Sequence, residues 1–352
     1  EKVPLLDCFT APCEGGCPIR QDIPEYMELC RTGRYTEALT LITEKNPLPF
    51  TTGTICAHCC QTKCTRNYYD ESVHIRETKL VAAENGYDAL MRSLKKPAPV
   101  TDGRKAAIIG GGPTGIAAAY FLGRAGIPVT VFEKSSRLGG VPMQVIPGFR
   151  ISEAAIEKDI ALMQFYGAEI RLNTPAPSVA ELNVAGYTHI FFAVGAGKAG
   201  RLNIPGNVVP VIQWLRDLKA GKKVSLGHVA VIGGGNTAMD AARAAIRSGA
   251  ASATLVYRRT KRYMPADAEE LELAMADGVR FLELAAPVAQ ENGRLKCERM
   301  TLGAPDEKGR RSPLPTGELM EFDCDTVIAA VGEQVEGELF TANGIAVNAK
   351  DI

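Results

Sequence analysis

Two glycine-rich turns, each between an apolar strand-like run and a helix-like run, constrain this chain more than any other feature of its sequence. The first follows the run AAII and contains Gly110, Gly112 and Gly115, and the second follows VAVI and contains Gly233, Gly235 and Ala238. In such turns one glycine makes the bend, another admits a pyrophosphate, and the last packs helix on strand. The pattern predicts two Rossmann-like units with phosphate at a helix N-terminus. The alternative interpretation is that both turns are tight strand-to-helix connections that bind no ligand.

The residues that follow the two turns differ in charge. Glu133 closes the second strand of the first unit, whereas Arg258 and Arg259 stand at the corresponding place in the second. A carboxylate there accepts hydrogen bonds from ribose hydroxyls, as in FAD or NAD. Paired guanidinium groups instead offer charge-assisted contacts to a 2′-phosphate. We therefore expect FAD in the first unit and NADPH in the second, the alternative for the arginines being a solvated strand end.

Bulk composition sets limits on partners and location. The 352 residues carry 40 Lys and Arg against 40 Asp and Glu, so no global field favours nucleic acid or an anionic membrane. No apolar run reaches the roughly 20 residues of a membrane-spanning helix, and no signal peptide is recognisable. We expect a cytoplasmic protein. Because the chain lacks an initiating methionine and stops at AVNAKDI, we also expect a piece of a longer polypeptide.

Seven of the ten cysteines fall in two short stretches, residues 8–17 and 56–64. Their spacing is C-x4-C-x3-C and then C-x3-C-x3-C, which favours iron-sulfur clusters over zinc, with ligands interleaved between the stretches. Cys59 is considered a reserve ligand. His58 either ligates a cluster or hydrogen-bonds a cluster sulfur, the alternative being a plain loop histidine. The remaining cysteines are expected in the core: Cys30, Cys297 and Cys324.

Breaks in composition divide the chain. A Pro-containing basic linker near residue 100 and a charged, glycine-containing stretch before residue 228 mark the main boundaries. The expected class is α/β, with a small α-helical iron-sulfur domain followed by two nested Rossmann-like domains. The domains are 1–100 for the clusters, 101–227 for FAD, 228–333 for NAD(P)H, and 334–352 as an incomplete return to the FAD domain.

These stretches together resemble a known family, the iron-sulfur flavoproteins that include the small subunit of glutamate synthase and the amino-terminal half of dihydropyrimidine dehydrogenase. The chain looks most similar to selenate-reductase-like iron-sulfur subunits. The resemblance is carried by the cysteine block, GGPTG with Glu133, LGGVPMQVIPGFR, GGGNTAMD and YRRTKRYMPA, and it spans essentially the whole chain.

The resemblance implies that NADPH gives hydride to FAD and that electrons leave through two 4Fe-4S clusters to a partner subunit or domain in a hetero-oligomer. No catalytic side chain is expected, because the cofactors carry the chemistry. Implied flavin contacts are Gly110, Gly111, Gly112, Pro113, Thr114, Gly115, Glu133, Gly140, Val141 and Arg150. Implied NADPH contacts are Gly233, Gly235, Asn236, Thr237, Ala238, Arg258, Arg259, Ala330, Val331 and Gly332. Implied cluster ligands are Cys8, Cys13, Cys17, Cys56, Cys60 and Cys64.

Two positions depart from the family pattern. The family has a further cysteine at the place of Leu5 and a Gln or Glu ligand at the place of Lys79, and an ammonium cannot ligate iron. Each cluster therefore lacks one ligand. Either one or both clusters are altered, or Cys59 supplies a ligand, or a ligand comes from outside the chain. Two other functions stay open: the glutamate synthase small subunit itself, and a non-catalytic, zinc-stapled nucleotide-sensing module.

Overall fold

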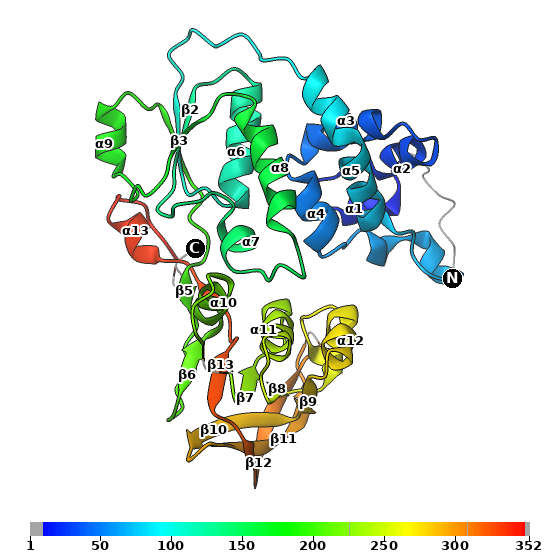
Figure 1. Cartoon of the computed structure of the whole chain (residues 1–352), viewed down its shortest axis with the longest axis vertical. Coiled ribbons are helices and arrows are strands. Elements are labelled where there is room, and N and C mark those ends of the chain that lie inside the picture. The colour runs from blue at the N-terminus through cyan, green and yellow to red at the C-terminus, as the bar shows by residue number, and fades with distance from the viewer. Residues whose placement is uncertain (1–9, 225, 308, 349–352) are drawn as a thin grey trace. The chain divides into compact units, whose positions relative to one another are not determined.

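The computed structural model describes residues 10–224, 226–307 and 309–348, and Figure 1 shows the order of its elements. The chain forms two compact units. The first comprises the residues up to Met143 together with Gly148–Gly195, and the second comprises Gln144–Pro147 together with the residues from Ala196 onward. Residues 196–227, which the sequence assigned to the FAD domain, lie in the second unit.

The first unit begins with a bundle of short helices around one long helix. These elements are α1 (Pro12–Gly16), α2 (Ile23–Arg31), α3 (Tyr35–Lys45), α4 (Pro49–Ile55), the 3-10 turns η1 (Gln61–Lys63) and η2 (Thr65–Tyr68), and α5 (Ile75–Ser93). Helix α2 starts with a proline in its first turn and buries Ile23, Tyr26 and Cys30, which lie on one face at helical spacing. Cys30 is therefore a core residue, as expected from sequence.

A four-stranded parallel sheet completes the first unit. Its strand order is β3-β2-β1-β4. The strands are β1 (Ala106–Ile109), β2 (Val129–Phe132), β3 (Glu169–Arg171) and β4 (His189–Phe192). The accompanying helices are α6 (Pro113–Arg124), α7 (Gly140–Gln144), α8 (Glu153–Gln164) and α9 (Val179–Val184). Strands β1 and β2 are buried along their whole length, which explains their continuous apolar sequence.

Within the first unit, a buried carboxylate joins the helical segment to the sheet segment. Asp159 on α8 is fully buried, and its two oxygens accept hydrogen bonds from the N–H groups of Phe50 (3.0 Å) and Thr51 (2.7 Å) at the start of α4. Nearby, the Tyr87 hydroxyl donates to the Lys158 carbonyl at 3.1 Å. The helical segment is thus fixed to α8 by bonds to its backbone rather than by apolar contact alone.

The second unit contains a five-stranded parallel sheet of order β6-β13-β7-β8-β9. The strands are β6 (Val208–Pro210), β7 (His228–Ile232), β8 (Ser252–Tyr257), β9 (Arg280–Glu283) and β13 (Thr326–Ala329). Its helices are α10 (Val211–Lys219), α11 (Asn236–Arg247), the 3-10 turn η3 (Lys261–Tyr263) and α12 (Ala268–Ala276). The apolar core of this unit includes one side of α11 and the inner residues of β7 and β8.

An antiparallel ribbon and short connecting pieces complete the second unit. The ribbon has the order β10-β11-β12. These elements are β10 (Ala285–Glu291), β11 (Arg294–Pro305), β12 (Arg311–Asp323), β5 (Lys198–Ala199), β14 (Glu333–Gln334) and α13 (Gly337–Thr341). Strand β14 pairs antiparallel with β5, so the chain entering the unit runs beside the chain that leaves the sheet. Cys297 and Cys324 are fully buried in the core beneath the ribbon.

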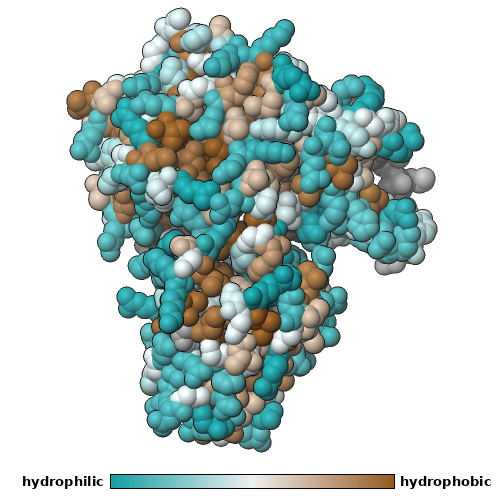
Figure 2. Space-filling model, in the orientation of Figure 1, coloured by the Kyte–Doolittle hydropathy of each residue, from teal (hydrophilic) through white to brown (hydrophobic). Residues whose placement is uncertain are grey.

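The face shown in Figure 2 is mainly hydrophilic and carries smaller apolar patches. Some large apolar side chains are exposed singly, such as that of Val184, the last residue of α9. Among the described residues, no helix combines the length and the apolar character needed to cross a bilayer.

Candidate functional site

The first glycine-rich turn joins β1 to α6 under tight steric control. A Cβ added to Gly115 would lie 1.9 Å from the Gly110 carbonyl oxygen, so only glycine lets this first turn of α6 approach the strand end. The N–H groups of Thr114 and Gly115 lie in that first turn, where the helix itself provides no acceptor. The turn therefore offers the donors that a pyrophosphate requires.

Glu133 binds the turn from the end of β2. Its side chain is only 6% exposed, and one oxygen accepts the Gly111 N–H while the other accepts the Ser135 N–H, both at 2.7 Å. Each carboxylate oxygen has a further lone pair for a ribose hydroxyl. Sequence reasoning gave Glu133 a role toward ribose only, and the backbone clamp on Gly111 is an addition that a one-dimensional pattern does not reveal.

The segment LGGVP lies against the same turn. The Gly139 N–H donates to the Gly111 carbonyl at 2.8 Å, and a Cβ added to Gly140 would lie 2.8 Å from the Gly112 Cα. Val141 is exposed next to this contact, and Arg150 is half-buried. Beside Gly112, apart from its chain neighbours, the one heavy atom of the described residues within 4 Å of an added Cβ is the Gly140 Cα at 3.8 Å, so there is room for a ligand. These residues fit the pyrophosphate and ribose of FAD.

The second turn repeats this design between β7 and α11. A Cβ added to Gly233 would lie 2.3 Å from the Ala330 carbonyl oxygen, so glycine is needed for the approach to the end of β13. Val331 and Gly332 directly follow Ala330 in the chain. An added Cβ at Gly235, the residue before α11, would meet no heavy atom within 4 Å. Ala238 replaces the third glycine and is fully buried.

A reciprocal pair of hydrogen bonds closes the second turn and was not anticipated from sequence. The Asp267 N–H donates to the Asn236 side-chain oxygen at 3.2 Å, and the Asn236 amide donates to the Asp267 carboxylate at 3.4 Å. The Ala266 N–H donates to the Gly234 carbonyl at 3.0 Å. The stretch MPAD, which follows YRRTKRY, therefore fixes the turn through these hydrogen bonds. Thr237 is half-buried in the first turn of α11.

The two arginines after β8 have different environments. Arg258 is exposed, whereas Arg259 is only 8% exposed and its Nε donates to the Arg311 carbonyl on β12 at 3.0 Å. Lys261 and Arg262 follow on η3 and are exposed like Arg258. Arg258 is therefore available to an incoming anion, with two further exposed cations on the 3-10 turn that follows it, and Arg259 supports the ribbon.

The two cysteine stretches lie side by side in the helical segment. Cys13 lies in α1 and Cys17 directly follows it, while Cys56 follows α4 and Cys60 and Cys64 flank η1. A Cβ added to Gly16 would lie 2.8 Å from the Lys63 side chain and 3.1 Å from the Cys59 carbonyl oxygen, which shows how closely the loops pack. Cys8 lies outside the described residues.

Electrostatic interactions connect thiols of the two cysteine stretches. Burial and, to a smaller extent, the nearby charges of Cys56 and Cys17 raise the pKa of Cys60 to about 11. Burial also raises the pKa of Cys13, with a smaller contribution from Cys64. Thiols that are far apart in the sequence therefore lie near one another. Soft thiols beside a buried apolar wall are the donor set of iron-sulfur clusters, which these residues therefore fit.

Other residues define what surrounds the thiols. Cys59 is exposed. No group of three His, Cys, Asp or Glu within the described ranges stands close enough to hold one metal ion. Lys79 on α5 is only 6% exposed, and burial lowers the pKa of its ammonium while the charges of Cys56, Cys60 and Cys17 raise it.

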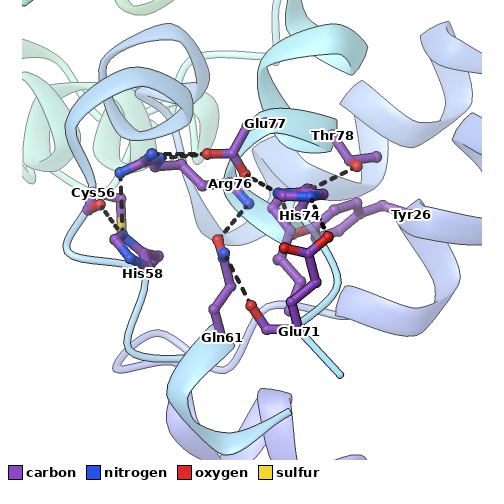
Figure 3. Close-up of polar contacts among 11 residues, drawn as sticks. Tyr26, Cys56, His58, Gln61, Glu71, His74, Arg76, Glu77 and Thr78 are labelled. Atoms are coloured by element: carbon purple, nitrogen blue, oxygen red, sulfur yellow. Dashed lines mark hydrogen bonds and ion pairs between the residues drawn. The ribbon is translucent and has the colours of Figure 1, made fainter. Parts of the chain in front are cut away.

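A polar network braces the second cysteine loop from α5 (Figure 3). The Arg76 guanidinium lies 3.2 Å from the His58 Nδ1, which in turn lies 3.2 Å from the Cys56 carbonyl oxygen. The Arg76 N–H donates to the Gln61 side-chain oxygen at 3.1 Å, and its Nε donates to Glu77 at 2.9 Å. Because a guanidinium only donates, the His58 Nδ1 accepts from Arg76, and this contact links the loop to α5. Sequence reasoning had left the role of His58 open.

Comparison with known proteins gives two family matches. Residues 104–352 match the pyridine nucleotide-disulphide oxidoreductase family, and residues 5–89 match dihydropyrimidine dehydrogenase domain II, which holds a 4Fe-4S cluster. The second match agrees with the cluster interpretation of the cysteine block and weighs against zinc staples.

Individual relatives agree with these matches. The chain is 43% identical over 355 residues to the putative oxidoreductase YgfK of Escherichia coli K12, covering 99% of this chain and 34% of YgfK. It is 31% identical to the small chain of the Escherichia coli NADPH glutamate synthase, covering 93% of this chain and 75% of that one. The resemblance to glutamate synthase small subunits is thereby confirmed. The chain spans about a third of the length of YgfK.

Solved structures confirm the expected fold. Mycobacterium tuberculosis FprA in complex with NADPH aligns with a TM-score of 0.55 at 20% sequence identity, covering 66% of this chain and 71% of FprA. At this identity the likeness concerns the fold of the two Rossmann-type regions.

Proposed function

This chain belongs to the pyridine nucleotide-disulphide oxidoreductase family, and from that premise we propose that it is an electron-input module. In this proposal NADPH binds the second unit, FAD binds the first, and two clusters in the helical segment pass electrons to a partner subunit or domain. Bound FAD would supply the conversion of a two-electron donor into single electrons. The observation that carries the proposal is the pair of glycine-rich turns with opposite charge behind them, Glu133 in one and Arg258 in the other.

The chain's own residues would bind and orient the nucleotides. The N–H groups at the start of α6 and α11 would hold the two pyrophosphates, with open space at Gly112 and Gly235. Glu133 would hold the flavin ribose while it keeps the Gly111 backbone in place. Val141, Arg150 and the residues Ala330 to Gly332 are assigned to the remaining contacts of the flavin and the nicotinamide nucleotide.

Specificity for the 2′-phosphate is assigned to Arg258, supported by Lys261 and Arg262. All three side chains are exposed, so a phosphate can reach them without breaking an internal bond. Arg259 contributes positive charge from behind, because its Nε is already bonded to the Arg311 carbonyl. The sequence suggested equal roles in phosphate binding for the two arginines, and we propose instead that Arg258 binds the phosphate and Arg259 supports the site.

For the clusters, we assign Cys17, Cys56 and Cys60 to one site, and Cys13 and Cys64 together with Cys8 to the other. The proposal includes a hetero-oligomer in which the partner accepts the electrons, and it is supported by the similarity to a chain named as the small chain of a larger enzyme. The domain limits 1–100, 101–227, 228–333 and 334–352 remain our assignment of these roles along the sequence.

Anaerobic titration with NADPH tests the proposal. Purified protein is expected to contain FAD, iron and acid-labile sulfide, and its flavin absorbance is expected to bleach on addition of NADPH. An unbleached flavin would contradict the proposed function. Arg258→Ala is expected to raise the KM for NADPH tenfold or more with little change for NADH, since it removes a charge-assisted contact. Arg259→Ala is the matched variant, expected to change the ratio of the two KM values less, and equal effects of Arg258→Ala on both nucleotides would remove the assignment.

A further inference from the structure

The basic loop that follows β8 is attached to the glycine-rich turn of the second unit at both of its ends. At the start of the loop, Tyr257 is only 7% exposed, and a Cβ added to Gly234 would lie 2.5 Å from its ring, so the ring lies directly against the turn. At the end of the loop, the Ala266 N–H donates to the Gly234 carbonyl at 3.0 Å. Residues 258–265 therefore form a loop whose two ends both contact one glycine.

The same tyrosine also contacts the 3-10 turn inside this loop. The Tyr257 hydroxyl donates at 2.7 Å to the carbonyl of Tyr263, the last residue of η3. Within the loop, the Tyr263 N–H donates to the Thr260 carbonyl at 2.9 Å, and the Met264 N–H donates to the Lys261 carbonyl at 3.1 Å. One buried side chain thus contacts the glycine-rich turn with its ring and the basic 3-10 turn with its hydroxyl.

The end of β9 holds the backbone of the loop from a second strand. The Glu283 carboxylate accepts the Lys261 N–H at 3.0 Å, and the Leu284 N–H donates to the Arg259 carbonyl at 3.2 Å. The backbone is therefore fixed from β8 and from β9, while the cationic side chains assigned to the 2′-phosphate stay exposed, namely those of Arg258, Lys261 and Arg262.

We propose that Tyr257 and Glu283 are positioning residues for the 2′-phosphate, because they hold the three exposed cations at a fixed place relative to the glycine-rich turn. The inference rests on the proposed function, which assigns NADPH to the second unit. A loop that is already ordered before the nucleotide binds loses less conformational entropy on binding, so its contacts contribute more to affinity. NADH has no 2′-phosphate, and its affinity therefore does not depend on where the three cations lie.

Binding of two adenosine nucleotides separates this role from general support of the fold. Adenosine 2′,5′-bisphosphate carries the 2′-phosphate, adenosine 5′-monophosphate lacks it, and neither can transfer hydride. Titration calorimetry with flavin-loaded, full-length protein measures both dissociation constants. Tyr257→Phe removes the hydroxyl and keeps the ring against Gly234. We expect this variant to bind the bisphosphate about two- to tenfold more weakly, as for the loss of one hydrogen bond, and to bind the monophosphate like wild type.

Tyr187→Phe is the matched control for the loss of a buried hydroxyl. The Tyr187 hydroxyl donates to the Thr130 Oγ1 at 2.9 Å in the first unit, so its removal is expected to leave both dissociation constants unchanged. An unchanged affinity of Tyr257→Phe for the bisphosphate overturns the inference. An equal loss of affinity for the two nucleotides also overturns it, because that result indicates a role in the fold of the whole site.

Glu283 gives an independent test at an exposed position, which does not depend on a substitution in the core. Glu283→Gln keeps an oxygen that can accept the Lys261 N–H, whereas Glu283→Ala has none, and both variants remove the same charge. We expect Glu283→Ala to bind the bisphosphate about twofold or more weakly than Glu283→Gln does, and the two variants to bind the monophosphate alike. Equal affinities of the two variants for the bisphosphate overturn the role of Glu283.

Failure of the proposed function gives a different result in these measurements. Wild-type protein would then bind the bisphosphate no more tightly than the monophosphate, which removes the assignment of a 2′-phosphate site to the second unit. Failure of the further inference instead leaves the preference of wild type intact and shows the same preference in Tyr257→Phe and in both Glu283 variants.

Discussion

Replacing Asp159 by asparagine is expected to remove much of the pH dependence of the contact between α8 and α4. Burial raises the pKa of Asp159 to about 7 from its ordinary value of 3.8, against the opposing effect of the hydrogen bonds from Thr51 and Phe50. The folded protein therefore favours the neutral carboxyl. Its contribution to stability is complete below the ordinary pKa and is lost as the pH rises through about 7.

The size of the effect follows from the shift of about three pKa units. Each unit corresponds to about 1.4 kcal/mol, so that full ionisation removes about 4 kcal/mol of the stability that the neutral carboxyl provides. About half of this loss falls between about pH 5 and pH 7, so the stability of the contact is expected to decrease by about 2 kcal/mol over this interval. An asparagine side chain does not titrate, so the Asp159→Asn variant should lack this component.

Hydrogen exchange at the Phe50 and Thr51 amides measures this contact directly. The free energy of local opening, corrected for the intrinsic exchange rate at each pH, is compared between wild type and Asp159→Asn. Asp88→Asn is the control, since Asp88 is an exposed acid on α5. An equal pH dependence in wild type and Asp159→Asn would refute the reasoning, and a reduced slope in Asp88→Asn would show that the effect is not specific to Asp159.

Two further predictions concern one carboxylate in each unit. Glu133→Ala leaves the N–H groups of Gly111 and Ser135 without their acceptor, so we expect at least a tenfold weaker retention of flavin, measured as the flavin-to-protein ratio after dialysis. Full flavin occupancy in this variant would contradict the clamp. The hydrogen bonds of Arg247 and Arg243 lower the pKa of Asp277 to about 2, so its contribution is present above the ordinary pKa and is lost as the pH falls toward that value. Asp277→Asn is expected to destabilise the second unit by about 1–2 kcal/mol near neutral pH and by less at acid pH. The loss of stability is measured from the fluorescence of Trp214 during guanidinium unfolding. Equal losses at both pH values would contradict the ion pair.

The sequence carried the identity of the two nucleotide units, because the physical demands of the βα turn are local. Glycines that must bend the backbone, an acid or an arginine at the end of the next strand, and an apolar run before the turn all lie within about 30 residues of one another. The spacing of the cysteines likewise indicates soft metal chemistry without reference to tertiary contacts. These features can be predicted from the sequence because each of them is contained in one short segment of the chain.

The difference between Arg258 and Arg259 and the burial of Lys79 depended on the tertiary structure. Arg258 and Arg259 are adjacent in sequence, and only Arg259 is buried, with its Nε bonded to the Arg311 carbonyl at the start of β12. Lys79 has the sequence context of an ordinary helix lysine, yet in the folded chain it is buried and interacts electrostatically with Cys17, Cys56 and Cys60. Local pattern thus determined which chemistries this chain contains, whereas long-range packing decided which side chains share a site, because contacts between distant segments leave no periodic trace in either segment.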